Sequence, residues 1–358
     1  MTNDADAIDT IIDDAIEAGV FPGAVVLVTR DGVVRKRAAY GHSLLYARPG
    51  QRHPDPIAMT EDTMFDLASL TKVVATTTAI LQLVEAGTVA LDAPASSYLD
   101  GFARADKRAI TVRHLLTHTA GLPANRPFYR RFHDAASIVA AVGRVRMAGQ
   151  PGAQVLYSDL GFMALGAIVE RTSGIPLDRY VARRIAAPLG LRHTRYLPPP
   201  EWRPCIAPTE CRTGREPIWG TVHDEKAAAM GGVAGHAGLF GDADDLATFT
   251  AALLDDGRCA SARVLRSETV REVFSPQTGA LEPARGLGWL RDDPSFMGAL
   301  AKPGAGVVGH TGFTGTSIVL DPERRLSVIL LTNRVHPGRN GPALGATRSA
   351  VAEAAASL

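Results

Sequence analysis

Strand-like segments at both ends of the chain, with a long helical stretch between them, limit its possible folds more than any other feature. Residues 23–41 read GAVVLVTRDGVVRKRAAYG, in which two β-rich runs flank Asp31-Gly32 and so predict a β-hairpin. Near the other end, residues 316–321 and 325–333 are two more strand-like runs joined by a short turn. Strands at both ends and helices between them indicate one sheet that the two termini complete.

Helical periodicity fills most of the remaining chain. Apolar residues recur at helical spacing in residues 5–18, and a longer apolar run predicts a buried helix from near Ser69 to Gly87. We expect a Pro- and Gly-containing loop at residues 41–60 and a closing helix at about 342–357. The pattern predicts an α/β (α+β) fold, in which an antiparallel sheet is flanked by helices and carries an inserted all-helical lobe. Further helical segments occupy residues 111–122, 135–149, 160–174, 177–190 and 243–257.

Composition and charge narrow the function classes. The chain has 358 residues, 46% of them apolar and 21% charged, and a formal net charge of +1, which is ordinary for a globular protein. We expect one domain over residues 1–358, with an α/β lobe at 1–60 and 235–358 and a helical lobe at 61–234. Acidic and basic residues are interspersed, so we expect no basic face for nucleic acid.

Hydropathy and the character of residues 1–19 bear on the expected location. No apolar run approaches the roughly 18 residues that a membrane span requires, so no membrane partner is expected. The acidic, amphipathic start is unlike a signal peptide, and we therefore expect a cytoplasmic protein. The oligomeric state stays open. The cysteines are too few for a disulfide framework: Cys205, Cys211 and Cys259.

Two motif-like patterns do not fit the sites they suggest. Gly304, Gly306 and Gly309 match G-x-G-x-x-G, but a dinucleotide fingerprint opens a helix, whereas this one precedes a β-branched run rich in Gly and Thr. His114 and His118 have i, i+4 spacing, but zinc hydrolases with that spacing carry Glu directly after the first His, where this chain has Leu. We expect neither a metal nor another cofactor.

Ser69-Leu70-Thr71-Lys72 is an S-x-x-K sequence at the start of the predicted buried helix. The Ser69 backbone N–H is expected at the helix N-terminus, where developing negative charge is favoured. Lys72 follows one turn later on the same face, and a lysine in an apolar helix is costly unless its charge is paired or suppressed. We expect a lowered pKa for Lys72, because a serine nucleophile requires an amine that deprotonates easily. The alternative is an N-cap serine followed by a lysine that extends to solvent.

Two later segments carry further polar groups. Tyr157-Ser158-Asp159 places a phenol and a carboxylate two residues apart, just before another predicted helix. His310-Thr311-Gly312 comes beside a predicted strand whose backbone can hydrogen-bond a substrate. Three such elements in this order are much less expected by chance than any one of them.

On these residues the sequence resembles the serine β-lactamase and penicillin-binding-protein superfamily, and it is most similar to class C β-lactamases and their esterase and peptidase relatives. The resemblance covers nearly the whole chain and includes ITVRHLLTHTAGLP and GHTGFTGTSIVLDP. A third stretch, GTVHDEKAAAMGGVAGHAGLFGDADDLATF, is similar to a bacterial subset of penicillin-binding-like peptidases and cell-wall amidases.

The resemblance implies one catalytic domain with its active site between the two lobes, and acyl transfer through a serine ester. Ser69 is the expected nucleophile, and Lys72, with Tyr157 as its partner, is expected to move the proton. The backbone N–H groups of Ser69 and Phe313 are the expected oxyanion hole. The expected substrate-binding residues are Asp159, His310, Thr311 and Gly312.

Two positions depart from the family pattern. Asp159 stands where the family has Asn, so when ionised it only accepts hydrogen bonds, and it can pair with Lys72 and keep it charged. His310 stands where the family has Lys, so a fixed cation becomes a group expected to titrate near neutrality. This exchange weakens the case for binding a carboxylate, and we expect short esters to be better substrates than penicillins.

The resemblance leaves the substrate open among small esters, amides and peptides. A carboxylesterase or a D-amino-acid peptidase or amidase is expected, and the alternatives are a β-lactamase, a biosynthetic acyltransferase and a non-catalytic sensor domain of the same fold. His223, Asp224 and His236 are expected to border the cleft. They either hydrogen-bond a Gly-rich loop or contact substrate.

Overall fold

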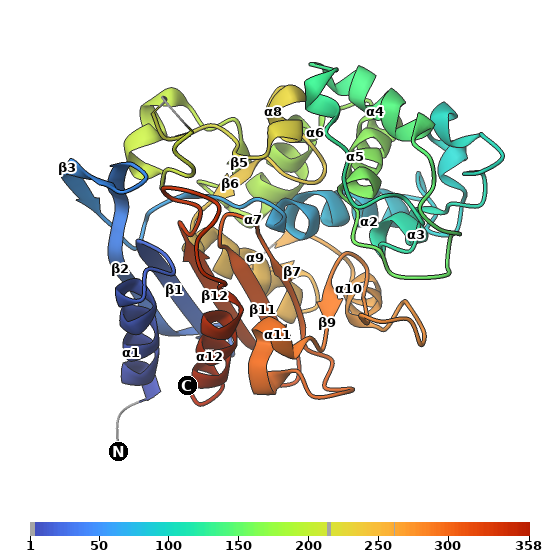
Figure 1. The fold of residues 1–358 in the computed structure, drawn as a ribbon. Helices are drawn as coiled ribbons and strands as arrows, with labels where there is room; N and C mark the ends of the chain where they lie inside the picture. The colour runs from blue at the N-terminus through green and yellow to red at the C-terminus, as the bar shows by residue number, and fades with distance from the viewer. Residues whose placement is uncertain (1–3, 213–215, 261) are drawn as a thin grey trace.

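A seven-stranded antiparallel sheet runs through the molecule, and strands from both ends of the chain meet within it (Figure 1). This computed structural model describes residues 4–212, 216–260 and 262–358. The strand order is β3-β2-β1-β12-β11-β10-β9. The early strand β1 (Gly23–Arg30) therefore pairs along its length with the last strand, β12 (Leu326–Thr332). The predicted antiparallel sheet, completed by segments from both ends, is confirmed.

The N-terminal hairpin turns at the predicted residues. Asp31 and Gly32 have φ angles of 54° and 73°, the left-handed backbone that a two-residue hairpin turn requires. The expected loop at residues 41–60 is wrong, because β2 (Val33–Arg48) continues through it and returns as β3 (Gln51–Ala58). The prolines of β3 lack a backbone donor, but this strand lies at the edge of the sheet, where proline is tolerated.

Helices cover both faces of the sheet, as predicted. Alternate residues of β1 divide between the two faces: Val26 packs in the cluster that includes Ile8 of α1 (Asp4–Glu17), whereas Leu27 packs in the larger cluster on the other face. On the first face α1 lies beside α12 (Gly345–Ala355), which also contacts α11 (Pro294–Met297) (Figure 1). On the second face α9 (Ala243–Leu254) contacts β1 and β12.

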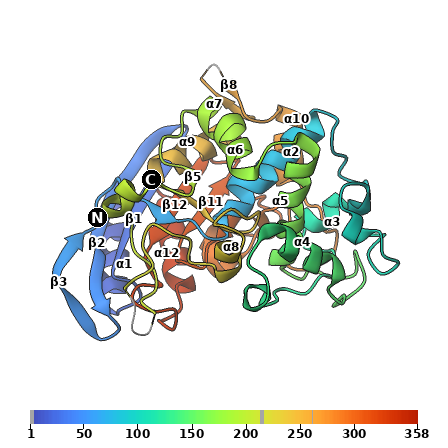
Figure 2. The ribbon, with the colours of Figure 1, turned by 90° about the horizontal axis from the view of Figure 1, so that it is seen from above.

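The helical part lies to one side of the sheet (Figures 1 and 2). The predicted buried helix near Ser69 is confirmed, with π-helical hydrogen bonds over Lys72–Thr77 before it continues as α2 (Thr78–Glu85). The remaining helices are α3 (Val112–Leu116), α4 (Ala135–Arg144), α5 (Asp159–Ser173), α6 (Leu177–Val181), α7 (Ala187–Leu189), α8 (Glu225–Ala229) and α10 (Ser267–Phe274).

A small second sheet connects the two parts of the molecule. Its strands β4 (Phe65–Asp66), β6 (Leu239–Gly241) and β5 (Arg195–Tyr196) place the residues just before Ser69 beside those just after His236. Viewed from above, α8 lies between α12 and the helices α4 and α5 (Figure 2). The remaining strands are β7 (Arg258–Cys259), β8 (Ala262–Arg263), β9 (Leu290–Arg291), β10 (Val308–Thr311) and β11 (Ser317–Asp321).

Candidate active site

Segments far apart in the sequence enclose a cavity of about 700 Å³. The cavity lies where the first turn of the Ser69 helix, the start of α5, the residues around α8 and the end of β10 meet. Nearly all of the predicted site residues line it: Ser69, Tyr157, Asp159, His310, Thr311, Gly312 and Phe313. The structure thus brings the three sequence motifs to one place.

Ser69 lies in the tight first turn of its helix, where the Lys72 N–H donates to the Ser69 carbonyl at 3.0 Å. The preceding residue, Ala68, has a φ of 46°, a conformation that costs energy in a residue with a Cβ and is common at functional sites. Lys72 is fully buried, and its Nζ donates to Ser69 Oγ at 2.8 Å. The alternative of a lysine extending to solvent is therefore wrong.

The charge of Lys72 is paired. Its Nζ lies 2.9 Å from Asp159 Oδ1 and donates to the His236 carbonyl at 3.1 Å. Burial disfavours the ammonium, but the Asp159 carboxylate and the adjacent Tyr157 outweigh it, so the pKa of Lys72 is raised. The expected lowered pKa of Lys72 is wrong, because Asp159 stands beside it as a counterion.

Tyr157 is held by His118. The Leu156 N–H donates to the His118 carbonyl at 2.8 Å, and the Ser158 N–H donates to His118 Nδ1 at 3.0 Å, so these bonds fix the backbone on both sides of Tyr157. The His118 ring also packs on the Tyr157 ring, with centroids 4.4 Å apart. The Tyr157 ring centroid in turn lies 4.9 Å from Lys72 Nζ.

The turn after β10 is tied to the segment before Ser69. Thr314 Oγ1 donates to the Asp66 carbonyl at 2.7 Å, and Thr316 Oγ1 donates to the Leu67 carbonyl at 3.1 Å. A Cβ on Gly312 would lie 2.7 Å from the Leu67 carbonyl oxygen, so only glycine allows this approach. The turn thereby brings the backbone of Gly312 and Phe313 close to Ser69, while the Phe313 side chain is 53% exposed. The oxyanion-hole role of the Ser69 and Phe313 N–H groups stays a prediction.

His310 does not titrate near neutrality, contrary to expectation. Its ring is buried, and burial together with the positive charges of Lys72 and Arg285 holds its pKa well below the usual range. Nδ1 donates to the Thr311 carbonyl at 2.9 Å, so the neutral ring carries its proton there. His310 is therefore uncharged at pH 7 and supplies no cation to a substrate.

Four arginines that the sequence analysis missed line the cavity: Arg285, Arg334, Arg339 and Arg348. Two of them contact predicted site residues, Arg285 over the Tyr157 ring and Arg348 at the Gly312 carbonyl. Arg285 is 5% exposed, and its Nε and Nη1 have no hydrogen-bond partner within the described part of the chain. Arg348 of α12 donates through Nη2 to the carbonyls of Gly312 and Thr316 at 3.2 and 2.9 Å. Burial lowers the pKa of the Arg285 and Arg348 guanidinium groups to about 10, which leaves both charged at pH 7. An arginine directly before the apolar run GLGWL was the available signal.

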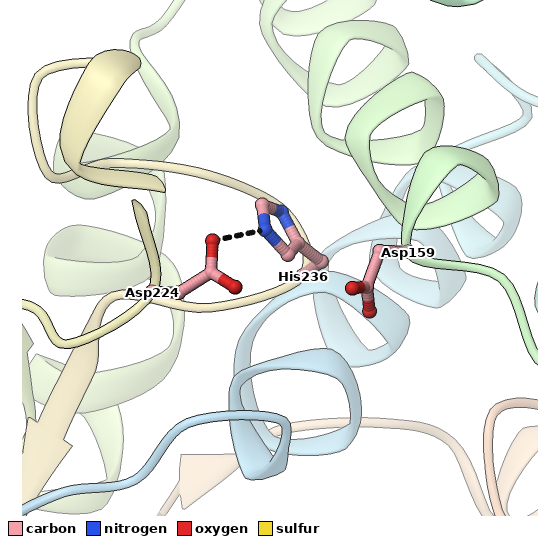
Figure 3. Close-up of side chains that lie close together, drawn as sticks. All are labelled: Asp159, Asp224 and His236. Atoms are coloured by element: carbon pink, nitrogen blue, oxygen red, sulfur yellow. Dashed lines mark hydrogen bonds and ion pairs between the residues drawn. The ribbon is translucent and has the colours of Figure 1, made fainter. Parts of the chain in front are cut away.

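Behind Asp159 lies a second buried lysine that the sequence analysis also missed. Lys226 Nζ contacts Asp159 Oδ2 at 2.8 Å and Asp224 Oδ2 at 3.3 Å, and donates to Asn125 Oδ1 at 3.1 Å. His236 Nε2 donates to Asp224 Oδ1 at 2.9 Å (Figure 3). Asp224 and His236 therefore border the cavity, as expected, and hydrogen-bond each other.

This grouping does not have the character of a metal site. Side-chain atoms of Asp159, Asp224 and His236 lie within 4.8 Å of one another (Figure 3). Two ammonium groups contact these carboxylates, however, so the positive charge that balances them comes from Lys72 and Lys226. Both carboxyl pKa values are lowered, because the neighbouring cations outweigh the effect of burial.

His223 borders the cavity at its rim. Its N–H donates to the buried carboxylate of Asp66 at 2.7 Å, and its Nε2 lies 3.3 Å from Glu210 Oε2. The ring stacks on Phe313, with centroids 5.7 Å apart. These contacts are structural, but their partners are Asp66, Glu210 and Phe313 and not the expected Gly-rich loop.

Of the patterns set aside in the sequence, His118 lies at the site, where its ring packs on Tyr157. Gly304 and Gly306 are in the turn before β10, and Gly309 lies within that strand, so no helix follows them. His114 closes a capping box with Thr111 at the start of α3. The three cysteines are free. Across residues 4–212, 216–260 and 262–358, every helix is too short or too polar to cross a bilayer.

Comparisons with known proteins agree with this arrangement. The chain is 35% identical to "N-acetylmuramyl-L-alanine amidase" of Bacillus subtilis strain 168, over 92% of this chain and 80% of that protein. It is 34% identical to "Putative D-alanyl-D-alanine carboxypeptidase" of Escherichia coli K12, over 92% of this chain and 82% of that protein.

Solved structures share the fold. EstCE1, described as a hydrolase with promiscuous acyltransferase activity, superposes with a TM-score of 0.75 at 26% identity, over 98% of each chain. A class C β-lactamase variant superposes with a TM-score of 0.77 at 19% identity, over 99% of this chain and 97% of the other. The sequence model of the Beta-lactamase family matches residues 8–353. The chain therefore belongs to the Beta-lactamase family, and it is a serine hydrolase.

Proposed function

We propose that this enzyme cleaves an amide bond in a small peptide-like substrate that bears a carboxylate, through an ester formed on Ser69. The observation that carries the proposal is the 2.8 Å contact between Ser69 Oγ and Lys72 Nζ, together with two arginines nearby. Arg285 and Arg348 line the cavity and have no acidic partner among their described hydrogen bonds and ion pairs. The first feature supports the chemistry, and the second supports the charge of the substrate.

In the proposed reaction, Ser69 Oγ attacks the substrate carbonyl carbon. The hydroxyl proton passes to the neutral form of Lys72, which lies beside Tyr157, and from there to the leaving nitrogen as the C–N bond breaks. The backbone N–H groups of Ser69 and Phe313 stabilise the oxyanion. Water then attacks the ester carbonyl, which releases the acid and restores the Ser69 hydroxyl. Thr311, Gly312, His310 and Asp159 line the space for the substrate.

The arginines replace the cation that the sequence analysis considered lost at His310. A buried guanidinium atom without a partner is costly, and a carboxylate relieves that cost with charge-assisted hydrogen bonds. Arg285 and Arg348 both border the cavity that contains His310-Thr311-Gly312. This placement supports a substrate carboxylate near the scissile bond, so the expected preference for uncharged esters is not part of the proposal.

The names of the relatives favour amides. The two relatives described above are named as an amidase and as a carboxypeptidase, whereas the esterase-like structure is less similar in sequence. Ester hydrolysis uses the same steps with an oxygen leaving group and is a second arm of the test. The cytoplasmic location stays a prediction, which cell fractionation with an antibody against the chain will check.

The test combines a covalent and a kinetic measurement. Intact-mass spectrometry with p-nitrophenyl acetate should show an acyl adduct that Ser69→Ala abolishes. A substrate panel then compares a D-alanyl-D-alanine peptide, its C-terminal amide, p-nitrophenyl acetate and nitrocefin. Arg285→Gln should raise KM for the free-carboxylate peptide about tenfold to a hundredfold and leave the amide nearly unchanged, because only the first loses a charge-assisted hydrogen bond.

Four outcomes contradict the proposal. An adduct that persists in Ser69→Ala removes Ser69 as the nucleophile. Equal effects of Arg285→Gln on both peptides remove the carboxylate subsite. If native protein forms no adduct and turns over no member of the panel, a non-catalytic sensor domain replaces the proposed function. If nitrocefin is the best substrate, a β-lactamase replaces it.

A further inference from the structure

Lys226 is a buried lysine beside the proposed catalytic groups that no step of the mechanism uses. It is 5% exposed, and its ammonium has an acceptor for each of its three hydrogens, on Asp159, Asn125 and Asp224. Asp224 also caps α8 by accepting from the Lys226 backbone N–H at 2.9 Å. Lys226 is thus fixed at both its backbone and its ammonium, and its described contacts, unlike those of Lys72, do not include Ser69.

The carboxylate of Asp159 is divided between two lysines. Oδ1 lies 2.9 Å from Lys72 Nζ, and Oδ2 lies 2.8 Å from Lys226 Nζ. The network continues through Asp224 to His236, whose carbonyl accepts from Lys72 at 3.1 Å. Two ammonium groups and two carboxylates therefore alternate along a chain of contacts, and His236 links the end of this chain, Asp224, back to Lys72.

We propose that Lys226 is a positioning residue that shares Asp159 with Lys72, and so allows Lys72 to release its proton and become the base for Ser69. This inference rests on the proposed roles of Ser69 and Lys72. With Lys226 present, the negative charge of Asp159 is partly neutralised, and a second cation lies nearby. Without Lys226, Asp159 has Lys72 as its remaining lysine partner and holds the ammonium more strongly.

The other charged and titratable groups around Lys72 are the same in the native protein and in Lys226 variants, so they influence the Lys72 ammonium in both. Burial and the cations around His118 keep the pKa of that imidazole well below its usual range, as at His310, so both rings stay neutral at pH 7. Burial disfavours the Lys226 ammonium, but the same two carboxylates that fix Lys226 outweigh it and raise its pKa. The groups that face Lys72 are Ser69, Tyr157, Asp159, His118, Arg285, His310 and, through its carbonyl, His236.

The pH dependence of kcat/KM for an uncharged ester tests the proposal. Lys226→Met removes the charge, and Lys226→Gln removes it but keeps a hydrogen-bond donor for Asp159. Both should move the acid limb of the profile up by about one pH unit. At a pH below both limbs this is about a tenfold loss, and the two profiles should meet again at alkaline pH. Lys226→Arg keeps the charge and should leave the limb in place.

Lys107→Met is the matched control. Lys107 is also fully buried and pairs with a neighbouring aspartate, Asp106, but it lies outside the cavity. It should cost stability without moving the limb. If Lys226→Met does not fold, the rate at which a fluorophosphonate labels Ser69 in Lys226→Gln, measured over the same pH range, gives the same comparison.

A uniform loss of activity at every pH in Lys226→Met and Lys226→Gln overturns the inference, because it means that Lys226 only holds the loop in place. So does a limb that moves equally in Lys226→Arg. Ser69→Ala distinguishes a failure of the role given to Lys226 from a failure of the proposed function. If it abolishes labelling and the limb does not move in the Lys226 variants, only the role of Lys226 is wrong; if labelling persists, the proposed nucleophile is wrong.

Discussion

One carboxylate determines most of the electrostatics at the site. Asp159 contacts two buried ammonium groups, those of Lys72 and Lys226. The pKa of Asp159 is lowered because those cations, with His236, outweigh burial, and the pKa of Lys72 is raised in return. Lys72 is therefore charged in the resting enzyme. The base form needed for Ser69 appears only as the pH rises, so kcat/KM for an uncharged ester should increase through the alkaline range.

Asp159→Asn should move that acid limb to lower pH. The substitution removes the negative charge that favours the Lys72 ammonium and leaves the positive charge of Lys226 nearby, so Lys72 gives up its proton more readily. We expect a shift of about one pH unit or more, opposite in direction to that of Lys226→Met. A pH series of kcat/KM with p-nitrophenyl acetate measures it.

Stability should fall in the same variant, because two buried lysines lose a partner at a cost of about 3–5 kcal/mol. Asp321→Asn is the control: Asp321 is 1% exposed and pairs with Arg324, away from the cavity. It should lower the urea midpoint and leave the pH profile unchanged. A limb that stays in place, or moves up, in Asp159→Asn contradicts the role given to this carboxylate.

Among the elements, the turn between β10 and β11 has the strictest geometric requirement. Its residues hydrogen-bond the carbonyls of Asp66 and Leu67, so the turn and the start of the Ser69 helix move as one unit. A Cβ on Gly312 would lie 2.1 Å from Thr316 Oγ1 and 2.7 Å from the Leu67 carbonyl oxygen. The turn has no room for even a methyl group.

Gly312→Ala should therefore separate the turn from the nucleophile. We expect a loss of about 1–3 kcal/mol in stability from overpacking, and a decrease in kcat of about a hundredfold because the Phe313 N–H moves away from the oxyanion. Urea unfolding and steady-state kinetics measure the two effects. Gly338→Ala is the control, since a Cβ there has nothing within 4 Å. If kcat in Gly312→Ala is native while stability falls, the turn does not contribute a donor to the reaction.

Whether a segment forms a helix or a strand could be predicted from the local sequence wherever one spacing of apolar residues dominated. The Asp31-Gly32 hairpin, the C-terminal strands and the buried helix after Ser69 were predicted correctly, because turn residues and apolar spacing act over short distances. Residues 41–60 were missed because prolines and glycines mark loops, yet an edge strand accommodates them.

The charge state of the site could be predicted only in part. The pairing of Asp159 with Lys72 was among the expectations, but Lys226, the second lysine on Asp159, belongs to a segment that only the fold brings to the site. Arg285 and Arg348 are single arginines in apolar surroundings, and the one local signal, the apolar run after Arg285, does not show that either residue reaches the cavity. For this reason the predicted pKa of Lys72 was wrong in direction and that of His310 was wrong in range. Burial and charges from distant segments determine both pKa values.

At the scale of the whole molecule, the site depends on a core that both parts share. The larger hydrophobic cluster contains Leu27 and Ile329 from the central sheet together with Leu70 and Phe162 from the helical part. Gly235 adds a backbone contact between the parts, because a Cβ there would lie 2.1 Å from the Phe162 carbonyl oxygen. The next residue, His236, binds Lys72 through its carbonyl. Movement of one part relative to the other therefore disturbs the catalytic groups.

This shared core predicts that the chain unfolds as one cooperative domain over residues 1–358. Urea unfolding followed by ester hydrolysis, by near-ultraviolet circular dichroism of the buried Trp289, and by far-ultraviolet circular dichroism should give one midpoint. Leu27→Ala in the sheet should cost about 2–5 kcal/mol and Phe162→Ala in α5 about 3–5 kcal/mol, because each leaves a cavity in the same cluster. Each variant should shift all three probes together. A contrary result would be a lowered midpoint of activity in Phe162→Ala together with a far-ultraviolet signal that separates into two transitions. In that case the helical part unfolds independently, and the active site lies between two domains instead of within one.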